Sequence, residues 1–288
     1  MGTARQMMLL FALVSCAPEI TPVAATNLRP EGSPDVLVVS VSGHCASCVG
    51  WSYNDEYLVD RGTPQAIANA LRDQGLTTQV WDYADAFYTW ESTKTGEVLV
   101  WGFLDLVAHL EWVEERWIAD FDNPTRIVVV GHSHGVVWAH SAVMAADHVP
   151  VEVLVDLDGV CLSWEDDAGT VGLGDDWNQV IDSYIAEGGQ DWWFDLSNPC
   201  DSWVVEDVDS LADIEDVVPD NARLNLEVLS SDWWLYDAQW NRRFDGSRSE
   251  VRSFVTSEGH GELLAPDGEA MGWVIPRVVE ALAPAEPR

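Results

Sequence analysis

Two stretches of the chain are nearly unbroken apolar runs that end close to a glycine. They cover residues 36–41 (VLVVSV) and 126–130 (RIVVV), with Gly43 and Gly131 after them. A strand with one face in water alternates apolar and polar residues, whereas runs like these are typical of strands buried on both faces. The chain is therefore predicted to hold a sheet covered on both sides, as in α/β proteins.

Helical patterns alternate with further strand candidates along the rest of the chain. Thr63 and Pro64 suit an N-cap and a first helical position, and the helical spacing that follows them stops at Gly75. Further strands are predicted at residues 77–81, 151–155, 224–229 and 251–256, and further helices at 103–119, 136–146 and 271–282. This order predicts a mostly parallel central sheet flanked by helices.

Length and charge limit the classes of protein to which the chain can belong. The chain has 288 residues, is 47% hydrophobic with 16 Trp, and fits one large globular domain. It carries 14 Lys plus Arg against 49 Asp plus Glu, a formal net charge of -35, and Lys94 is its only lysine. Nucleic-acid binding relies on Lys and Arg contacts to phosphates, so it is not expected. The same charge repels anionic lipids and anionic substrates.

The first residues have the form of an export signal. Residues 1–15 contain the apolar run 7–14, which is too short to span a bilayer as a helix. Leu13-Val14-Ser15-Cys16 resembles the lipobox of bacterial lipoproteins. The resemblance implies lipid attachment to Cys16 and a place at the bacterial cell envelope, with Ala17 favouring the outer membrane. The alternative is an ordinary secretory signal and a secreted or periplasmic protein.

The signal is followed by a proline-rich segment and then by the folded domain. Residues 16–34 are predicted to form an extended tether, and residues 35–288 the domain. Besides Cys16, the cysteines are Cys45, Cys48, Cys161 and Cys200. In an oxidising compartment four cysteines indicate two disulfides, with three pairings open. Half of a metal site at His44, Cys45 and Cys48 is the alternative, but there is no second Cys-x-x-Cys, so no metal is expected.

The strand and helix alternation lapses in an inserted segment at about residues 159–222, which is dense in Trp, Asp and Glu. Two interpretations remain open for it: a cap that shapes a substrate pocket, or a surface excursion. Its acidic run 207–216 is expected to be a solvated face, because it lacks the spacing of an EF-hand calcium loop.

The sequence Gly131-His132-Ser133-His134-Gly135 joins a predicted strand to a predicted helix. At such a junction a Gly-x-Ser-x-Gly turn exposes the serine hydroxyl at the carboxyl edge of the sheet, and the glycines relieve crowding. Ser133 is therefore the candidate nucleophile. The side chain of His134 is expected to be solvent-exposed or structural, and His132 is either a packing residue or part of the motif.

A nucleophilic serine needs a base and an acid that orients the base. The histidines His134, His140 and His148 lie in or near the helix after Ser133, so His260, in a Gly-flanked loop after the last strand, is the candidate base. Asp232, which follows strand 224–229, is the preferred acid. Asp237 and Asp156 are the alternatives.

These residues resemble the α/β-hydrolase family over most of the chain from residue 35 onward. The resemblance implies that Ser133 is the nucleophile, His260 the general base and later acid, and Asp232 the group that orients the imidazole.

The resemblance also implies an oxyanion hole made by the backbone N–H of His134 and by one N–H near His44 or Cys45. The order Gly43-His44-Cys45 departs from the common His-Gly order of the family, which puts that second donor in doubt.

The expected function is a serine hydrolase that cleaves a small-molecule or lipid ester through an acyl-enzyme, with no cofactor. The Trp-rich segments 192–194 and 233–234 indicate an apolar acyl or aromatic pocket. Amidase or thioesterase chemistry could use the same triad. A non-catalytic binding protein with the hydrolase fold is the alternative from another class.

Overall fold

The computed structural model describes residues 26–43, 57–85, 87, 90–93, 96–99, 101–161, 183–190, 192, 194, 200, 203–205, 210–231 and 239–283. Several predictions fall outside these residues: the export signal, Cys16, His44, Cys45, Cys48, Asp232 and Asp237.

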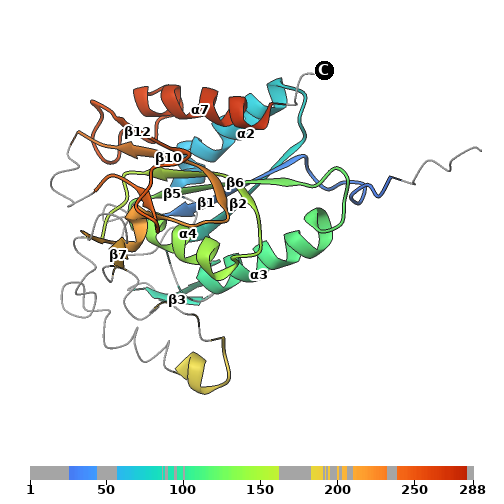
Figure 1. Ribbon diagram of the computed structural model, residues 1–288, viewed down its shortest axis with the longest axis horizontal. Coiled ribbons are helices and arrows are strands. Elements are labelled where there is room, and N and C mark those ends of the chain that lie inside the picture. The colour runs from blue at the N-terminus through green and yellow to red at the C-terminus, as the bar shows by residue number, and fades with distance from the viewer. Residues whose placement is uncertain are drawn as a thin grey trace, which may run out of the picture.

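A six-stranded sheet forms the centre of the fold (Figure 1). Its order is β12-β10-β6-β5-β1-β2, and every neighbouring pair is parallel. The strands are β1 (Val36–Ser42), β2 (Thr78–Ala84), β5 (Arg126–His132), β6 (Val151–Leu157), β10 (Ala222–Leu229) and β12 (Val251–Val255). The predicted α/β class with a parallel central sheet is confirmed.

Helices cover both faces of this sheet (Figure 1). On one face lie α2 (Thr63–Asp73) and α7 (Glu269–Leu282), which contact each other. On the other lie α3 (Phe103–Val113), which continues as the π-helical turn η1 (Glu114–Ile118), and α4 (His134–Ala145). A short helix, α1 (Tyr57–Arg61), precedes α2.

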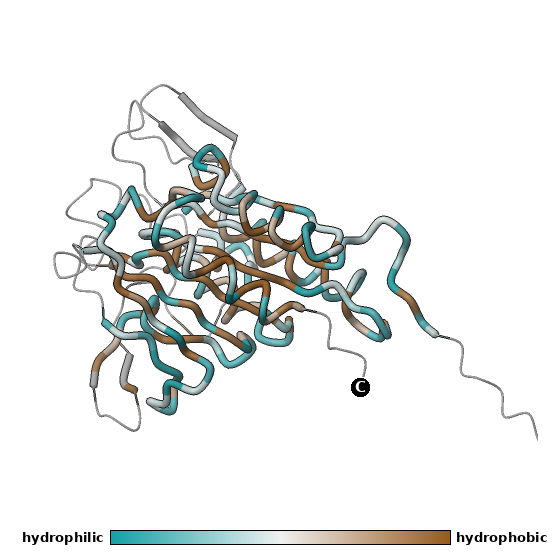
Figure 2. Tube along the Cα trace, turned by 90° about the horizontal axis from the view of Figure 1, so that it is seen from above, coloured by the Kyte–Doolittle hydropathy of each residue, from teal (hydrophilic) through white to brown (hydrophobic). Residues whose placement is uncertain are grey.

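The two layers of helices explain the apolar runs. In β5, Ile127 and Val129 pack into the core on the α3 and α4 side, whereas Val128 and Val130 pack into the core under α2 and α7. Successive side chains of a strand point to opposite faces, so a strand covered on both faces needs apolar residues at consecutive positions. Figure 2 shows the result, with hydrophobic strands inside and hydrophilic turns at their ends.

Smaller strands and a turn accompany the sheet in the described part of the chain. They are the antiparallel pairs β3 (Trp90–Thr93) with β4 (Gly96–Leu99) and β7 (Trp203–Val205) with β8 (Ser210–Ala212), the parallel pair β9 (Val217–Val218) with β11 (Arg242–Arg243), and the 3-10 turn η2 (Ile214–Asp216). Much of the predicted insertion at 159–222 lies outside the described residues, so its role as a cap stays a prediction.

The prediction of a solvated face for the acidic run is wrong at its end. Asp213, Glu215 and Asp216 are buried. The η2 turn is held against α4 because His140 Nδ1–H donates to the carbonyls of Ile214 and Val217, both at 3.0 Å. This contact joins segments more than 70 residues apart in the sequence, and the local pattern gave no signal for it.

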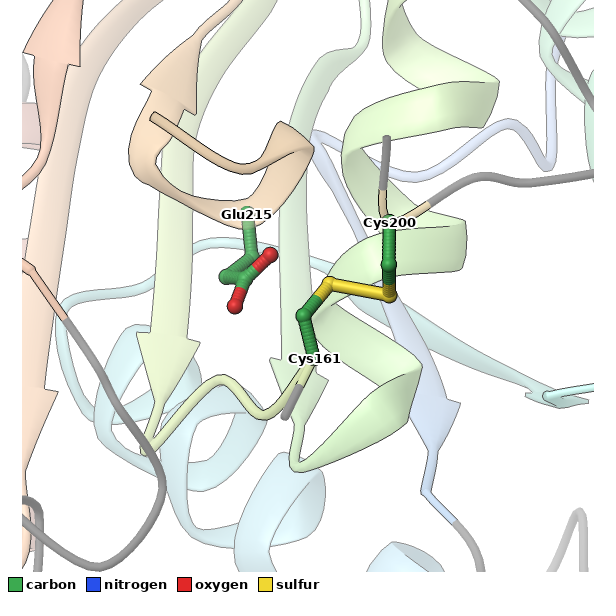
Figure 3. A group of neighbouring side chains, drawn as sticks. All are labelled: Cys161, Cys200 and Glu215. Atoms are coloured by element: carbon green, nitrogen blue, oxygen red, sulfur yellow. A yellow bond between two sulfur atoms is a disulfide. The ribbon is translucent and has the colours of Figure 1, made fainter. Parts of the chain in front are cut away.

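A disulfide closes the loop that follows β6. Cys161 and Cys200 are bonded, both are buried, and Glu215 lies beside them (Figure 3). One of the two expected disulfides is thus observed, while Cys45 and Cys48 fall outside the described residues.

The end of the predicted tether is bound to the domain. The N–H of Asn27 donates to Asp122 Oδ2 at 2.8 Å, and the N–H of Arg29 donates to Asn123 Oδ1 at 2.9 Å.

None of the helices in the described ranges combines the length and the apolar character that crossing a bilayer requires.

Candidate active site

Ser133 occupies the tight turn between β5 and α4. Its backbone has φ 56° and ψ -136°, a region that L-residues rarely adopt and that costs on the order of 1 to 3 kcal/mol. Two hydrogen bonds hold it there: its N–H donates to the carbonyl of Leu157 at 3.1 Å, and its carbonyl accepts from Val136 N–H at 3.0 Å. The strain therefore lies at the residue predicted to be the nucleophile.

The two glycines of the turn are required by close backbone contacts. A Cβ at Gly131 would lie 2.7 Å from Val136 Cα, and a Cβ at Gly135 would lie 2.3 Å from the carbonyl oxygen of Val41. Real Cβ atoms do not approach other atoms this closely. The motif is thus the packed strand–turn–helix junction that the sequence predicted.

Gly43, at the end of β1, passes close to the nucleophile. A Cβ there would lie 2.6 Å from Ser133 Cβ and 3.2 Å from the backbone nitrogen of His134. The loop after β1 therefore begins beside the N–H that the resemblance assigns to the oxyanion hole. The candidate second donors, His44 and Cys45, follow directly but lie outside the described residues.

His260 is paired with a carboxylate that the sequence reasoning missed. His260 Nδ1–H donates to Asp158 Oδ2 at 2.6 Å. Asp158 is fully buried and directly follows β6, with φ 54°. Its other carboxylate oxygen accepts from Ser230 N–H at 2.7 Å, and its own N–H donates to the carbonyl of Val228 at 2.7 Å. The carboxylate is thus fixed on both sides.

Asp156, an alternative predicted acid, serves another network. Its Oδ1 lies 3.1 Å from His140 Nε2, and its Oδ2 accepts from Asn241 Nδ2 at 2.7 Å and also from Asn225. The predicted strand 151–155 in fact runs to Leu157, so Asp156 lies within the strand and Asp158 at its carboxyl end. Asp232 and Asp237 lie outside the described residues and remain predictions.

A signal for Asp158 was present in the sequence. Asp158 is the first residue after β6, and Gly159 follows it. In the sheet, β6 lies next to β5, the strand that leads to Ser133. Carboxyl ends of neighbouring parallel strands meet at one edge of the sheet, where binding and catalytic groups gather. Because the predicted strand ended at residue 155, two residues before the end of β6, Asp158 was not recognised as the residue at this edge.

His132 contacts the loop that carries His260. Its Nε2–H donates to the carbonyl oxygen of His260 at 3.1 Å, and the two ring centroids are 4.7 Å apart. Burial lowers the pKa of His132 to about 3, and the charge of His260 acts in the same direction. The candidate base therefore lies against the residue that precedes Ser133.

His134 is buried rather than solvent-exposed. Its Nδ1 lies 3.3 Å from Asp85 Oδ2, and its ring meets Trp138 edge to face at 6.1 Å. A structural role for this side chain, one of the two predicted, agrees with these contacts. They also hold the first residue of α4, whose backbone N–H is the expected oxyanion donor.

A buried polar network lies beneath α4. Burial lowers the pKa of His140, but the Asp156 carboxylate and the carbonyls that accept its Nδ1–H outweigh burial and raise it overall. Burial raises the pKa of Asp216 to about 7, with Asp213 adding to the effect, and burial raises the pKa of Glu227 to about 8. The carboxylate of Asp156 thus favours the charged form of His140, and the hydrogen bonds of His140 hold the η2 turn against the helix that follows Ser133.

Two groups of side chains in the described part of the chain have ligand atoms within 4.8 Å of one another. One consists of Asp213, Glu215 and Asp216, and the other of Glu215 with Cys161 and Cys200. The two cysteines form a disulfide and so offer no thiolate to a metal (Figure 3). Clustered carboxylates alone do not define a metal site.

Removing the disulfide is expected to weaken both the fold and the site. Cys161 lies three residues after Asp158, so the Cys161–Cys200 bond ties down the loop that presents the carboxylate. Replacing both cysteines with alanine should lower the free energy of unfolding by about 3 to 4 kcal/mol, as expected for closing a loop of this length. Thermal unfolding and ester turnover of the double variant measure the two effects. An unchanged melting temperature would contradict the structural role of the bond.

Comparison with family models and with curated proteins found no match. Comparison with solved structures found an esterase from Pyrococcus furiosus, with a TM-score of 0.43 and 13% identity over 86% of this chain and 80% of that chain. The carboxylesterase EstE1 from a metagenomic library has a TM-score of 0.44 and 17% identity over 91% and 81% of the two chains. An esterase from Pyrobaculum calidifontis has a TM-score of 0.43 and 12% identity over 91% and 78%. At such scores, conclusions about this chain rest on its own residues.

Proposed function

We propose that the chain is a serine hydrolase of the α/β-hydrolase family that cleaves an ester bond through an acyl-enzyme. Ser133 is the nucleophile, His260 the general base and acid, and Asp158 the carboxylate that orients His260. One observation carries the proposal: His260 is bonded to a buried carboxylate and packs on His132, the residue that directly precedes the strained Ser133.

In the first half of the reaction, the Ser133 hydroxyl attacks the ester carbonyl carbon and its proton passes to Nε2 of His260. The tetrahedral intermediate then collapses, and the C–O bond to the alcohol breaks. The departing alkoxide takes the proton from His260, which leaves an acyl group on Ser133.

In the second half, water attacks the acyl carbon while His260 Nε2 removes a proton from the water. Collapse of the second intermediate frees the carboxylic acid and returns the proton to Ser133. Throughout, the Asp158 carboxylate accepts the Nδ1–H of His260. It keeps the lone pair on Nε2 and stabilises the imidazolium that forms.

The negative charge on the tetrahedral oxygen is stabilised by backbone N–H groups that are already in place. The N–H of His134, at the start of α4, is one of them, and Asp85 and Trp138 hold that residue. Gly43, which follows β1, lies beside Ser133 and the backbone nitrogen of His134, and His44 and Cys45 follow it in the sequence, which supports a second donor from one of them.

An envelope location belongs to the proposal as well. The lipobox-like sequence at Cys16 supports lipid anchoring, and the bonds from Asn27 and Arg29 fix where the preceding segment leaves the domain. The substrate is then an ester that reaches the envelope, and the net charge disfavours anionic ones.

Turnover of p-nitrophenyl esters of increasing acyl length tests the function. The full chain is expected to hydrolyse at least one member of the series and to lose activity when one equivalent of a phosphonate ester is added. The dependence on acyl length sizes the acyl pocket. Turnover of p-nitroanilide or thioester analogues alone would assign amidase or thioesterase chemistry instead, and no phosphonate-sensitive turnover of any of these compounds would contradict the proposal.

A further inference from the structure

We propose that His132 is a positioning residue for the general base. Its Nε2–H holds the backbone carbonyl of His260 and its ring packs on the imidazole, so that Nδ1 of His260 stays on Asp158. This inference rests on the proposed function and adds a residue to its machinery.

The position of His132 is fixed by the sheet. It is the last residue of β5, which pairs with β1 on one side and with β6 on the other, and it stands opposite Leu157 of β6. It directly precedes Ser133 and is buried. A contact made from this residue is therefore made from the same rigid strand end that carries the nucleophile.

The bond from His132 adds to the contacts that hold the loop carrying His260. Gly259 and Gly261 flank His260, and glycine gives a backbone more conformations than other residues do. The loop is anchored at its start by Glu258. The side-chain carboxylate of Glu258 accepts the N–H of Glu269 at 2.9 Å, and the backbone carbonyl of Glu258 accepts the N–H of Ser231 at 2.9 Å. The bond from His132 reaches His260 itself, 3.1 Å from its carbonyl oxygen.

His132 and His260 have different roles. Burial lowers the pKa of His132 to about 3, so His132 remains neutral at any pH at which an esterase works. Because its partner is a carbonyl oxygen, the neutral ring must carry its proton on Nε2. His132 is thus a permanent donor, and His260 alone takes up the proton from Ser133.

In the described part of the chain, further groups near the pair come from α1 and from the residue after β6. The Tyr57 ring of α1 lies 5.8 Å from the His132 ring, and Arg61 donates to the Tyr57 hydroxyl at 3.3 Å. Arg61 adds to the lowering of the pKa of His132. Asp158, after β6, faces His260 and accepts its Nδ1–H.

Two substitutions test the hydrogen-bond donor and the aromatic ring of His132 separately. His132→Gln keeps an N–H donor near the Nε2 position, whereas His132→Phe keeps an aromatic ring and removes the donor. We expect His132→Phe to lower kcat by about 30- to 100-fold with KM within about threefold, because small misplacements of a catalytic group have effects of this size. His132→Gln should recover most of that loss. Rates are divided by the fraction of active sites that a phosphonate ester titrates.

Recovery of kcat by the donor variant distinguishes positioning from loosened packing. Equal losses of kcat in His132→Phe and His132→Gln would mean that His132 only fills space, and would overturn the inference.

A double-variant cycle tests the route of the effect. If His132 acts through the bond between His260 and Asp158, His132→Phe should cost little more than about threefold in an Asp158→Asn background. A full additive loss would contradict that route. Wild-type rates in His132→Phe, beside an inactive Ser133→Ala, would refute this inference alone, whereas activity in Ser133→Ala would refute the proposed function.

Discussion

Replacing Ser133 with alanine should lower kcat for ester hydrolysis on the order of 10⁶-fold, because the reaction loses the atom that forms the acyl-enzyme. The variant should still fold. Alanine is smaller than serine, and the turn is held by backbone bonds to Leu157 and Val136 that do not use the hydroxyl. Turnover of p-nitrophenyl esters, measured beside thermal unfolding, checks both statements.

Ser141→Ala is the matched control. Ser141 is buried like Ser133, but it lies within α4, where its hydroxyl donates to the carbonyl of Val137 at 2.8 Å. Its removal should leave kcat within about twofold, since the loss of such a bond affects stability by only about 1 kcal/mol. Substantial turnover in Ser133→Ala, or loss of turnover in Ser141→Ala alone, would contradict the role given to Ser133.

Replacing Asp158 with asparagine should lower kcat by about 10³- to 10⁴-fold. The surroundings decide how the asparagine amide is placed. Its oxygen takes the N–H of Ser230, so its NH₂ group faces Nδ1 of His260. An NH₂ there requires a lone pair on Nδ1, which moves the proton to Nε2, where the base must have its lone pair. The variant tests the tautomer while preserving the shape of the site.

Two further asparagine variants serve as comparisons. Asp156→Asn changes a buried carboxylate two residues earlier that faces His140 and two asparagines, so it should lower the melting temperature but spare kcat. Asp232→Asn should leave both unchanged if Asp158 is the acid. A loss of about 10³-fold in Asp232→Asn, with a nearly active Asp158→Asn, would restore the sequence prediction and refute the assignment of Asp158.

The parts of the fold and site that could be predicted are those that local sequence encodes. The run at 36–41 requires apolar neighbours on both faces, and the glycines around Ser133 are dictated by approaches below 3 Å. Both features are visible in a few consecutive residues. His260 was selected as the candidate base by elimination among the histidines after Ser133, and its bond to a buried carboxylate supports that proposal.

The parts that escaped prediction depend on long-range contacts. Asp158 becomes the partner of His260 because β6 runs to Leu157 and lies between β5 and β10. The sequence indicates that a strand ends near Gly159, but it does not give the order of the strands in the sheet. The burial of Asp216 depends in the same way on His140, which reaches the η2 turn from another element. Acidic side chains are normally exposed, so composition predicted the opposite.

The proposed chemistry requires one covalent event, and it can be observed directly. The full chain is treated with a fluorophosphonate probe, digested, and mapped by peptide mass. We expect a single adduct on Ser133, formed in stoichiometric amount and much more slowly in Asp158→Asn. An adduct on another residue, labelling that persists in Ser133→Ala, or no labelling of a chain that hydrolyses esters would contradict the mechanism.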